Sequence, residues 1–335
     1  MKAVRLHGSG GLERLTVAAM DEPGAPQKGE ILVRLHASSL NFHDYLVAIG
    51  KIPTADGLIP LSDGAGVVEG VGEGVSDFTV GDRVVSCFFP EWQNGEAVPS
   101  VVATVPGDTV DGYARERVVR PAHWFTPAPK NYSHAEAATL TTAGLAAWRA
   151  LVVDGPLKAG ETVLALGTGG VSIFALQFAK MMGASVIVTS SSDEKLAHAR
   201  ALGADHTINY KQHPQWAEQV LALTNGRGVD HVIEVGGPDT LPQSINACRI
   251  GGHIAFIGVL TGFSGPIPTV ALLTHQARLQ GLQVGNRQQQ IEMIRALDAN
   301  AMKPVIDKTF PLAELGEAFS YEAAGGHFGK ICIDI

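Results

Sequence analysis

A glycine-rich turn between an apolar run and an amphipathic segment is the feature of this sequence best suited to chemistry. Gly167, Gly169 and Gly170 directly follow the apolar residues 163–166, and a helical pattern of apolar side chains starts at Val171. Glycines let the backbone turn sharply and approach a pyrophosphate closely, while the N-terminus of the next helix directs N–H groups at that anion. The predicted cofactor contacts in this turn are Gly167, Thr168, Gly169, Gly170 and Val171.

The third glycine position of the usual dinucleotide fingerprint holds Ser172 in this chain. Glycine or alanine is usual there because the helix packs closely on the strand, and serine is nearly as small. A glycine-rich turn alone is often only a turn. Here Gly183 can end the helix, and the apolar residues 184–189 read as the next strand, so the strand–turn–helix–strand order favours a nucleotide site.

Three serines, Ser190, Ser191 and Ser192, end that second strand, where an NAD-specific site usually places an acid. An acid would repel a 2′-phosphate by roughly 4 kcal/mol for unit charges about 4 Å apart at an effective dielectric of about 20. Neutral Ser190 removes this repulsion, and Ser191 and Lys195 can donate hydrogen bonds to a phosphate. The alternative is that Ser192 or Asp193 only caps the next helix. The sequence therefore predicts NADPH in preference to NADH.

Composition limits the classes of partner. The 335 residues carry a net charge of −8, which argues against nucleic acid or an anionic membrane as a main partner. The three cysteines lie far apart, and neither an apolar signal core nor a membrane-length apolar run is present. We expect a cytoplasmic protein that acts on a small-molecule substrate.

The elements that must position this site fall into two regions. Residues 1–124 contain short alternating runs and many glycines and prolines, which predicts a small β-rich domain. Beyond residue 135, helical segments alternate with apolar strands, which predicts an α/β domain with a doubly wound parallel sheet. Residues 87–113 are the least regular and are expected to form an ordered loop carrying Phe88, Phe89 and Trp92. Strands are expected near 206–208, 230–235, 253–259 and 330–335, and helices near 215–224, 240–250 and 291–297.

Several motifs in the same order resemble the medium-chain dehydrogenase/reductase superfamily over essentially the whole chain. They are residues 1–11 (MKAVRLHGSGG), 40–44 (LNFHD), 62–66 (SDGAG), 81–84 (GDRV), 167–172 (GTGGVS), and Gly251-Gly252 leading into Ile257-Gly258. The chain looks most like the zinc-independent, alcohol-dehydrogenase-like branch that includes quinone oxidoreductases. The resemblance implies a GroES-like catalytic domain from residues 1–124 and 286–335, and a Rossmann domain from residues 125–285. It also implies a nicotinamide held between the two domains, and a homodimer formed through an edge strand near 279–284.

The resemblance also implies where a catalytic zinc would be held. Zinc-dependent members use a cysteine, a histidine, and a second cysteine or an acid, and this chain has Asn41, Ser62 and about Thr142 at those positions. Amide and hydroxyl groups are poor zinc ligands compared with thiolate, imidazole or carboxylate. The cysteine cluster that binds structural zinc in many relatives is missing as well. We therefore predict that the protein holds no zinc.

Without a metal, another group must polarise the acceptor and supply a proton. Asn41 could donate from its amide to a carbonyl oxygen or to the nicotinamide ribose, His43 could relay a proton, and Tyr45 could offer its phenol. Asp44 could orient His43 or a backbone turn. The alternatives are structural: Asn41 as a helix cap, Asp44 as a charge at the helix start, and Tyr45 as a core residue.

Further cofactor contacts follow from position in the resemblance and from the rule that ligands lie at the carboxyl ends of parallel strands. For two of them there is a plain alternative, an exposed turn aromatic at Tyr210 and a solvated side chain at Arg287. The predicted contacts are Tyr210, Gly236, Ile257, Gly258, Val259, Asn286 and Arg287.

Together these features predict a zinc-independent, NADPH-preferring oxidoreductase that transfers hydride to a small carbonyl acceptor. A quinone or an α,β-unsaturated ketone or aldehyde is the expected acceptor. One alternative is a metal-free alcohol dehydrogenase or ketone reductase, for which only His43 or Tyr45 could supply the acid. Another is an NADPH-binding protein without turnover, which the dinucleotide segment fits equally well.

Overall fold

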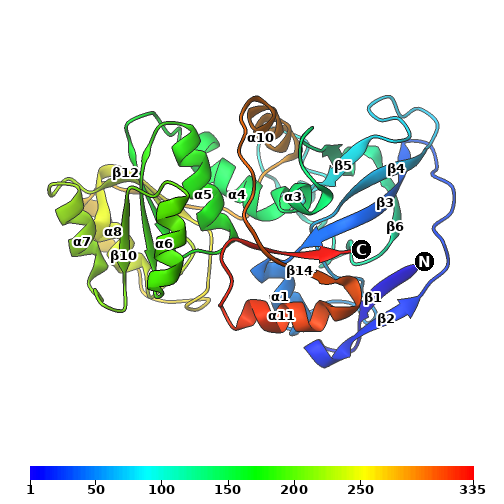
Figure 1. The fold of residues 1–335 in the computed structure, drawn as a ribbon, viewed down its shortest axis with the longest axis horizontal. Helices are drawn as coiled ribbons and strands as arrows, with labels where there is room; N and C mark the ends of the chain where they lie inside the picture. Colours follow the sequence, from blue (N-terminus) through cyan, green and yellow to red (C-terminus); the bar gives the residue numbers. More distant parts are fainter. The chain divides into compact units, whose positions relative to one another are not determined.

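The computed structural model describes all residues, Met1–Ile335, and they form two compact units. Unit 1 comprises Met1–Leu145 and Val284–Ile335, and unit 2 comprises Ala146–Gln283 (Figure 1). The first boundary between the two units follows Leu145, whereas the sequence predicts it after residue 124. The reason is that strand β7 (Phe125–Pro127) pairs with β5 (Arg83–Ser86), and helix α3 (His134–Ala138) packs on β3 (Glu30–Ser39). Residues 125–145 therefore extend the β-rich unit.

Unit 1 is built on a seven-stranded sheet with the order β14-β15-β3-β4-β5-β7, in which β6 also pairs with β3. The remaining strands of this sheet are β4 (Ala65–Val71), β6 (Arg117–Pro121), β14 (Ile306–Pro311) and β15 (Lys330–Asp334). A separate antiparallel pair comprises β1 (Lys2–Leu6) and β2 (Leu15–Ala19). The helices are α1 (Phe42–Ala48), α2 (Pro99–Val102), α3, α10 (Arg287–Ala299) and α11 (Leu315–Ala323), with the 3-10 turns η1 (Leu12–Arg14), η2 (Ala122–Trp124) and η5 (Leu312–Glu314) and the π-helical segment η3 (Leu140–Gly144).

The C-terminal strand of unit 1 runs beside the segment that carries the predicted catalytic residues. β15 pairs antiparallel with β3, with Cys332 opposite Ser39. One residue past β3, the Leu40 N–H donates to the Ile331 carbonyl at 2.9 Å. This register brings Lys330, at the start of β15, next to the beginning of α1.

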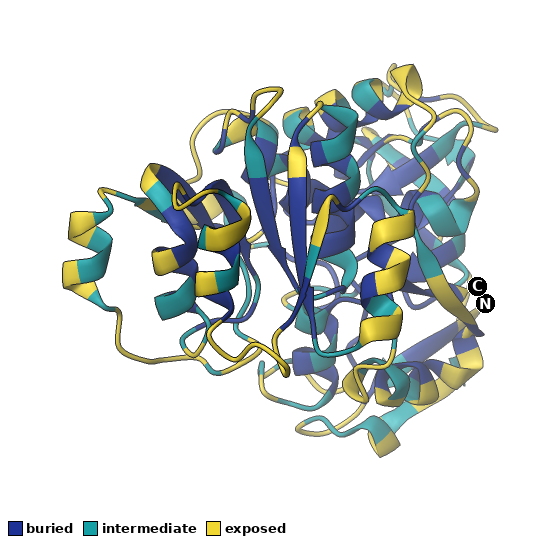
Figure 2. Ribbon diagram, turned by 60° about the vertical axis from the view of Figure 1, so that its left-hand side comes forward, coloured by how far each residue is buried: buried dark blue, intermediate teal, exposed yellow.

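Unit 2 is a six-stranded parallel sheet with the order β10-β9-β8-β11-β12-β13. Its strands are β8 (Thr162–Leu166), β9 (Ser185–Ser190), β10 (His206–Asn209), β11 (Val229–Glu234), β12 (Cys248–Phe256) and β13 (Arg278–Gly281). The helices are α4 (Leu145–Trp148, which starts in unit 1), α5 (Gly170–Met181), α6 (Asp193–Ala201), α7 (Trp216–Leu223), α8 (Leu241–Ala247) and α9 (Thr269–Thr274), with the turn η4 (Arg149–Val153). Figure 2 shows the buried strands flanked by helices whose outer faces are exposed.

These two architectures confirm the expected fold class, a β-rich domain together with a doubly wound parallel sheet. Because the strand order reverses between β8 and β11, their carboxyl ends border the place where such sheets bind ligands. The expected helix at 240–250 is shorter, since the chain enters β12 at Cys248 and pairs with Val229 there. The expected edge strand at 279–284 is β13, which ends at Gly281.

The irregular stretch of residues 87–113 is ordered, as predicted. It contains only the short helix α2, and its aromatic residues Phe88, Phe89 and Trp92 are buried. Elsewhere, no helix of the structure combines the length and the apolar character needed to cross a lipid bilayer.

Candidate functional site

The glycine turn of unit 2 ends β8 and begins α5. Gly167 has a φ of 74°, in the left-handed region that glycine favours, and a Cβ at Gly167 or Gly169 would meet no heavy atom within 4 Å. The N–H groups in the first turn of α5, which includes Gly170 and Val171, have no acceptor within the helix, as at every helix start. No side chain at Gly169 caps them either. Thr168 lies buried within the turn. The open space and the unbonded N–H groups fit a dinucleotide pyrophosphate.

Ser172 explains how this turn tolerates the loss of its third glycine. The side chain is 2% exposed, and its hydroxyl donates to the Leu166 carbonyl at 2.6 Å. The polar atom is therefore satisfied by the strand that precedes the turn, and the helix keeps its close approach to β8. Serine at this position is compatible with the predicted fingerprint.

The three serines lie at the carboxyl end of β9, beside the end of β10. Ser190 is buried, and the Tyr210 N–H donates to its carbonyl at 3.1 Å, while the Tyr210 side chain is exposed. Ser192 caps α6 by accepting from the Lys195 N–H, and Ser191 is half-buried. The structure thus places Ser190 and Ser191 at the end of β9, Tyr210 just after β10 and Lys195 in the first turn of α6, and the capping alternative for Ser192 holds as well.

Asp193 is the carboxylate nearest in sequence to this serine cluster. Its two oxygens accept from Asn209 Nδ2 at 2.8 Å and from Gln212 Nε2 at 3.0 Å. The charge is therefore bound to the loop after β10 and does not take the position of Ser190 at the strand end.

A buried carboxylate, Glu234, organises the next predicted contacts. One oxygen accepts from the N–H groups of Gly236 and Gly237 at 2.7 and 3.0 Å and from the Thr240 hydroxyl at 2.6 Å, and the other accepts from the Ser244 hydroxyl. The Glu234 side chain thereby fixes the turn between β11 and α8. The sequence pattern predicts a strand end here, but nothing in it indicates this role for Glu234.

The predicted contacts 257–259 follow β12 and lie against the same turn. The Ile257 and Gly258 N–H groups donate to the Glu234 carbonyl at 2.8 and 3.2 Å. A Cβ on Gly258 would lie 2.0 Å from the Val235 carbonyl oxygen, so only glycine fits this approach. The predicted residues Gly236, Ile257, Gly258 and Val259 thus gather at the carboxyl ends of β11 and β12.

Asn286 and Arg287 lie in unit 1, at the start of α10. Asn286 caps that helix by accepting from the Gln289 N–H at 2.9 Å. The Arg287 guanidinium donates to the Phe125 carbonyl at 3.0 Å and lies 3.6 Å from Asp77. These partners show a structural role for both side chains, and their contact with a cofactor stays a prediction.

Asn41 precedes α1 in unit 1 and is held by charged neighbours. Its Nδ2 donates to Asp44 Oδ2 at 3.0 Å, its backbone N–H donates to the same oxygen at 3.1 Å, and its Oδ1 accepts from Lys330 Nζ at 2.6 Å. Asp44 Oδ1 accepts from the Ser62 N–H at 2.8 Å. Asp44 therefore orients a backbone turn and the Asn41 amide, and the expectation that it orients His43 is not met.

The Lys330 ammonium is buried among carboxylates. It donates to the Leu40 carbonyl and lies 3.8 Å from Asp63 Oδ2, and both side chains are almost fully buried. Burial raises the pKa of Asp63 to about 6, although the nearby Lys330 opposes this shift. Burial also raises the pKa of Glu322, a further acid near Lys330, to about 8. No sequence pattern predicts this cluster, because Lys330 is remote from Asn41 along the chain.

The three positions that the family resemblance assigns to zinc ligands, Asn41, Ser62 and Thr142, lie close together. The Ser62 and Thr142 hydroxyl oxygens are 3.5 Å apart, and Thr142 donates to Asp63 Oδ1 at 2.6 Å. Asn41 is tied to the same Ser62 through Asp44. The three side chains offer only amide and hydroxyl oxygens, which fit zinc poorly. No group of three or more histidine, cysteine, aspartate or glutamate side chains in the structure is arranged to hold a metal.

His43, on the first turn of α1, faces a carboxylate that sequence analysis missed. Its Nε2 lies 3.4 Å from Asp108 Oδ2, and its ring meets the edge of Phe88. Burial raises the pKa of Asp108, and the nearby His43 partly opposes this. Asp108 lies in the irregular 87–113 stretch, where no sequence pattern points to a contact with α1.

Tyr45 is half-buried and packs against the core of unit 1. Its ring lies 6.0 Å from that of Phe42 and 6.3 Å from that of Phe319, against a cluster of buried apolar residues. This environment favours the structural alternative for Tyr45, and a chemical role for its phenol stays a prediction.

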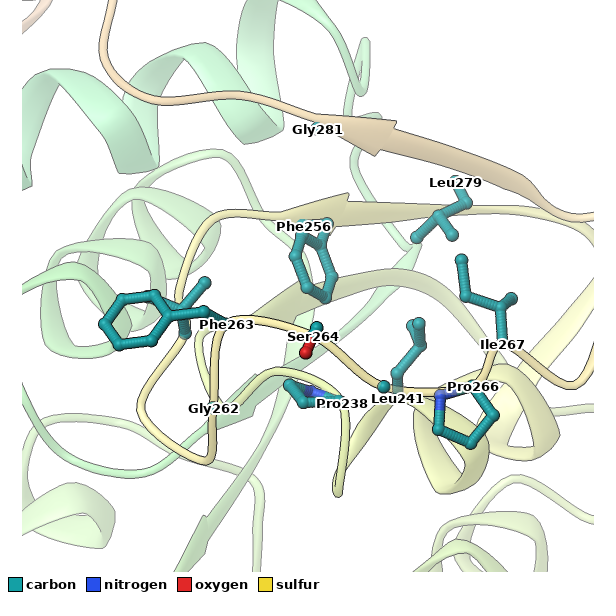
Figure 3. A pocket seen from close by; sticks show the side chains of 12 residues that line it. Pro238, Leu241, Phe256, Gly262, Phe263, Ser264, Pro266, Ile267, Leu279 and Gly281 are labelled. Carbon is teal, nitrogen blue, oxygen red and sulfur yellow. The ribbon is translucent and has the colours of Figure 1, made fainter.

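An apolar cavity of about 350 Å³ also lies in unit 2 (Figure 3). It is bordered by the start of α8, the loop after β12, and β13, and Phe256, Leu241 and Leu279 point into it. Of the predicted cofactor contacts, only Val259 lines it. The cavity therefore lies beside the predicted dinucleotide site rather than on it.

Two family descriptions match the sequence. Residues 27–130 match the alcohol dehydrogenase GroES-like domain, and residues 170–299 match the zinc-binding dehydrogenase family. A zinc-type alcohol dehydrogenase-like protein of Schizosaccharomyces pombe is 43% identical over 97% of this chain and 96% of its own length. A 2-haloacrylate reductase of a Burkholderia species is 30% identical over 99% of this chain and 98% of its own length.

Solved structures give the same assignment. An NAD-dependent alcohol dehydrogenase superimposes with a TM-score of 0.91 and 33% identity, covering 100% of both chains. A mycobacterial protein complexed with NADPH superimposes with a TM-score of 0.83 and 26% identity, again covering 100% of both chains. Together with the two units and their glycine turn, these similarities establish that the chain belongs to the medium-chain dehydrogenase/reductase superfamily and is an alcohol-dehydrogenase-like oxidoreductase.

Proposed function

We propose that this protein is a zinc-independent reductase that uses NADPH to reduce a quinone or an α,β-unsaturated ketone or aldehyde. The observation that carries the proposal is the polar cluster of unit 1, where the Ser62 and Thr142 hydroxyls lie 3.5 Å apart beside Asn41 and a buried ammonium. This cluster offers hydrogen-bond donors where zinc-dependent relatives hold a metal.

The buried ammonium is a physical argument against zinc. Lys330 Nζ lies 2.6 Å from Asn41 Oδ1, so a metal ion bound at Asn41 would stand against a positive charge already in place. Like charges a few ångströms apart repel by several kcal/mol when water is excluded. The relatives named as zinc-type keep zinc as the rival, and metal analysis decides between the two.

The preference for NADPH rests on the end of β9. Ser190 presents no charge there, and Ser191, Lys195 at the start of α6 and Tyr210 just after β10 could donate hydrogen bonds to a phosphate. A structural neighbour in complex with NADPH supports this choice, whereas a neighbour named as NAD-dependent supports NADH. When bound, the cofactor supplies a hydride from C4 of its nicotinamide ring.

The acceptor class follows from what unit 1 can offer. Addition of hydride to the β-carbon of an enone leaves negative charge on the carbonyl oxygen, and this charge needs only a hydrogen-bond donor and a proton. The Asn41 amide can donate that hydrogen bond, and His43 or water can supply the proton. The relative named 2-haloacrylate reductase supports an activated C=C bond as the target.

A second candidate, a metal-free ketone reductase or alcohol dehydrogenase, is favoured by the contact between His43 and Asp108. Reduction of an isolated ketone requires a proton donor at the oxygen, and an imidazole beside a carboxylate is suited to that task. A panel of quinones, enones, aldehydes and simple ketones, assayed with NADPH and NADH, tests both candidates. Turnover of quinones or enones with NADPH supports the first, turnover confined to simple ketones supports the second, and cofactor binding without any turnover contradicts both.

We also propose that the protein forms a homodimer through unit 2. β13 pairs only with β12, so its outer edge has unpaired backbone groups. In the segment that precedes this strand, Phe263, Val270 and Leu273 are exposed, and α9 has no buried residue. Sedimentation should show a dimer that Val270→Lys with Leu273→Lys converts to monomer, whereas Val80→Lys, an exposed position of unit 1, should not. A monomeric wild type would contradict this.

A further inference from the structure

Lys330 is a charged side chain in the interior of unit 1, and the proposed reaction gives it no role in hydride or proton transfer. It is 3% exposed and begins β15, the strand that pairs with β3. Its Nζ donates to the Leu40 carbonyl and to Asn41 Oδ1, and it lies 3.8 Å from Asp63. Burying an ammonium group costs free energy unless it is hydrogen-bonded and paired with an opposite charge. The fold supplies both for Lys330.

The two partners of the Asn41 amide fix which way it faces. An ammonium group can only donate, so the atom at 2.6 Å from Lys330 Nζ must be the amide oxygen. The carboxylate of Asp44 already accepts from the Asn41 and Ser62 backbone N–H groups, and it accepts from Asn41 Nδ2 at 3.0 Å. A flipped amide would place its NH₂ against the ammonium and its oxygen against the carboxylate. The flip is therefore disfavoured on both sides.

This orientation determines what Asn41 can offer to a ligand. Nδ2 has two hydrogens and uses one for Asp44, which leaves an N–H available for a further acceptor. Hydrogen bonding of Oδ1 to a cation also polarises the amide and makes the remaining N–H a stronger donor. A carbonyl oxygen that gains negative charge during reduction is the type of acceptor that such a donor stabilises most.

We propose that Lys330 is a positioning residue that locks Asn41 as a hydrogen-bond donor to the carbonyl oxygen of the substrate. The inference rests on the proposed reductase function, because the carbonyl acceptor comes from there. The alternative is that Lys330 only neutralises the buried carboxylates Asp44 and Asp63. The two roles differ in whether the effect of Lys330 passes through Asn41.

A double-mutant cycle separates these roles. Lys330→Met should lower kcat/KM for an enone by about tenfold, the upper range for one oriented hydrogen bond, and leave the dissociation constant of NADPH unchanged. In the Asn41→Ala background the same change should have no further effect on kcat/KM. Lys330→Arg should retain more activity than Lys330→Met, because it keeps a buried cation. Lys308→Met is the matched control: Lys308 lies over the rings of Phe310 and Tyr321, and its loss should not alter kcat/KM.

A spectroscopic measurement on the protein without cofactor tests the lock independently of turnover. In protein labelled with ¹⁵N-asparagine, the side-chain NH₂ pair of Asn41 is identified by its loss in Asn41→Ala. Lys330→Met should shift this pair and speed its hydrogen exchange, and Lys308→Met should leave it in place. If Lys330→Met fails to fold, Lys330→Gln, which removes the charge and keeps a polar end group on a side chain one atom shorter, replaces it in both experiments.

An unchanged Asn41 NH₂ pair, or an equal loss of kcat/KM with and without Asn41, would overturn the proposal and leave Lys330 a structural role. The failure of the proposed function is a different result. If the wild type reduces none of the acceptors, the carbonyl role of Asn41 is lost, while the NMR experiment still shows whether Lys330 sets the amide.

Discussion

His43 Nε2 lies 3.4 Å from Asp108 Oδ2, so the first turn of α1 meets a loop residue more than sixty positions away in the sequence. Neither side chain is freely exposed, with 25% and 16% of their side-chain surfaces accessible. The contact gives the predicted proton relay a carboxylate partner. Asp44 and Asp108 therefore have different partners. Asp44 accepts a hydrogen bond from the Asn41 amide, and Asp108 lies next to the His43 ring.

Asp108→Asn should lower kcat by about tenfold for acceptors that need a proton at oxygen, less than the roughly 10²–10⁴-fold contribution of a general acid itself, because His43 remains in place. The reason is that an amide stabilises a protonated imidazole less well than a carboxylate does. Steady-state kinetics on a simple ketone and a quinone measure the effect, which should be larger for the ketone. The exposed pair His7 and Asp56, 3.5 Å apart, supplies the control Asp56→Asn. If Asp108→Asn and Asp56→Asn have the same kcat, Asp108 has no part in proton transfer.

Ser190→Asp should reverse the preference between cofactors. A carboxylate at the end of β9 would repel a 2′-phosphate and accept a hydrogen bond from a ribose 2′-hydroxyl, so the ratio of NADPH to NADH affinity should fall by at least about tenfold. Ser185→Asp, at the exposed opposite end of the same strand, is the control. Fluorescence titration with both cofactors measures the ratio. If Ser190→Asp leaves this ratio unchanged, the end of β9 does not discriminate between cofactors with and without the 2′-phosphate.

Glu234→Gln should weaken binding of either cofactor by about tenfold, the effect of replacing hydrogen bonds to a charged acceptor by weaker neutral ones. Glutamine has only one acceptor oxygen, so its NH₂ group would face either the Gly236 and Gly237 N–H groups or the Ser244 hydroxyl, and the turn would be held less firmly. Glu218→Gln, on the exposed face of α7, should have no effect. Calorimetric titration provides the comparison, and unaltered affinity in Glu234→Gln would show that this turn does not contribute to binding.

Stability should fall as the pH rises from about 6.5 to about 8, because burial raises the pKa of Glu322 from 4.5 to about 8. The folded protein keeps a proton that the unfolded chain releases, so rising pH favours unfolding in this interval. Burial lowers the pKa of His134 and His253 to about 4, and these groups act in the opposite direction only below about pH 6.5. In Glu322→Gln, the free energy of unfolding should depend less on pH over this interval.

Denaturant unfolding across this pH interval, with Glu317→Gln on the same helix as the control, measures the free energy of unfolding. A slope that persists in Glu322→Gln would assign the titration to another group. Part of the Glu322 side chain reaches the surface, but its Oε2 is buried without a hydrogen-bond partner, which is the reason that the charged form is disfavoured.

The sequence predicted the parts of this protein that depend on local patterns. The turn at Gly167 follows an apolar strand and precedes an amphipathic helix, so neighbouring residues alone reveal it. The register of β15 on β3, by contrast, depends on the whole sheet, and with it the contact between Lys330 and Asn41. Local patterns therefore reveal Asn41 and Asp44, but neither Lys330, which holds the Asn41 oxygen, nor the carboxylate next to His43.

The central claim, hydride transfer from NADPH to an activated C=C bond without zinc, is tested most directly by product analysis. The protein is assayed after its metal content has been measured, with NADPH deuterated at C4 and an α,β-unsaturated ketone as acceptor. The account predicts deuterium at the β-carbon of a saturated ketone, formed by protein that contains no stoichiometric zinc. Deuterium at the carbonyl carbon of an allylic alcohol, or activity that requires one zinc per chain, would contradict it.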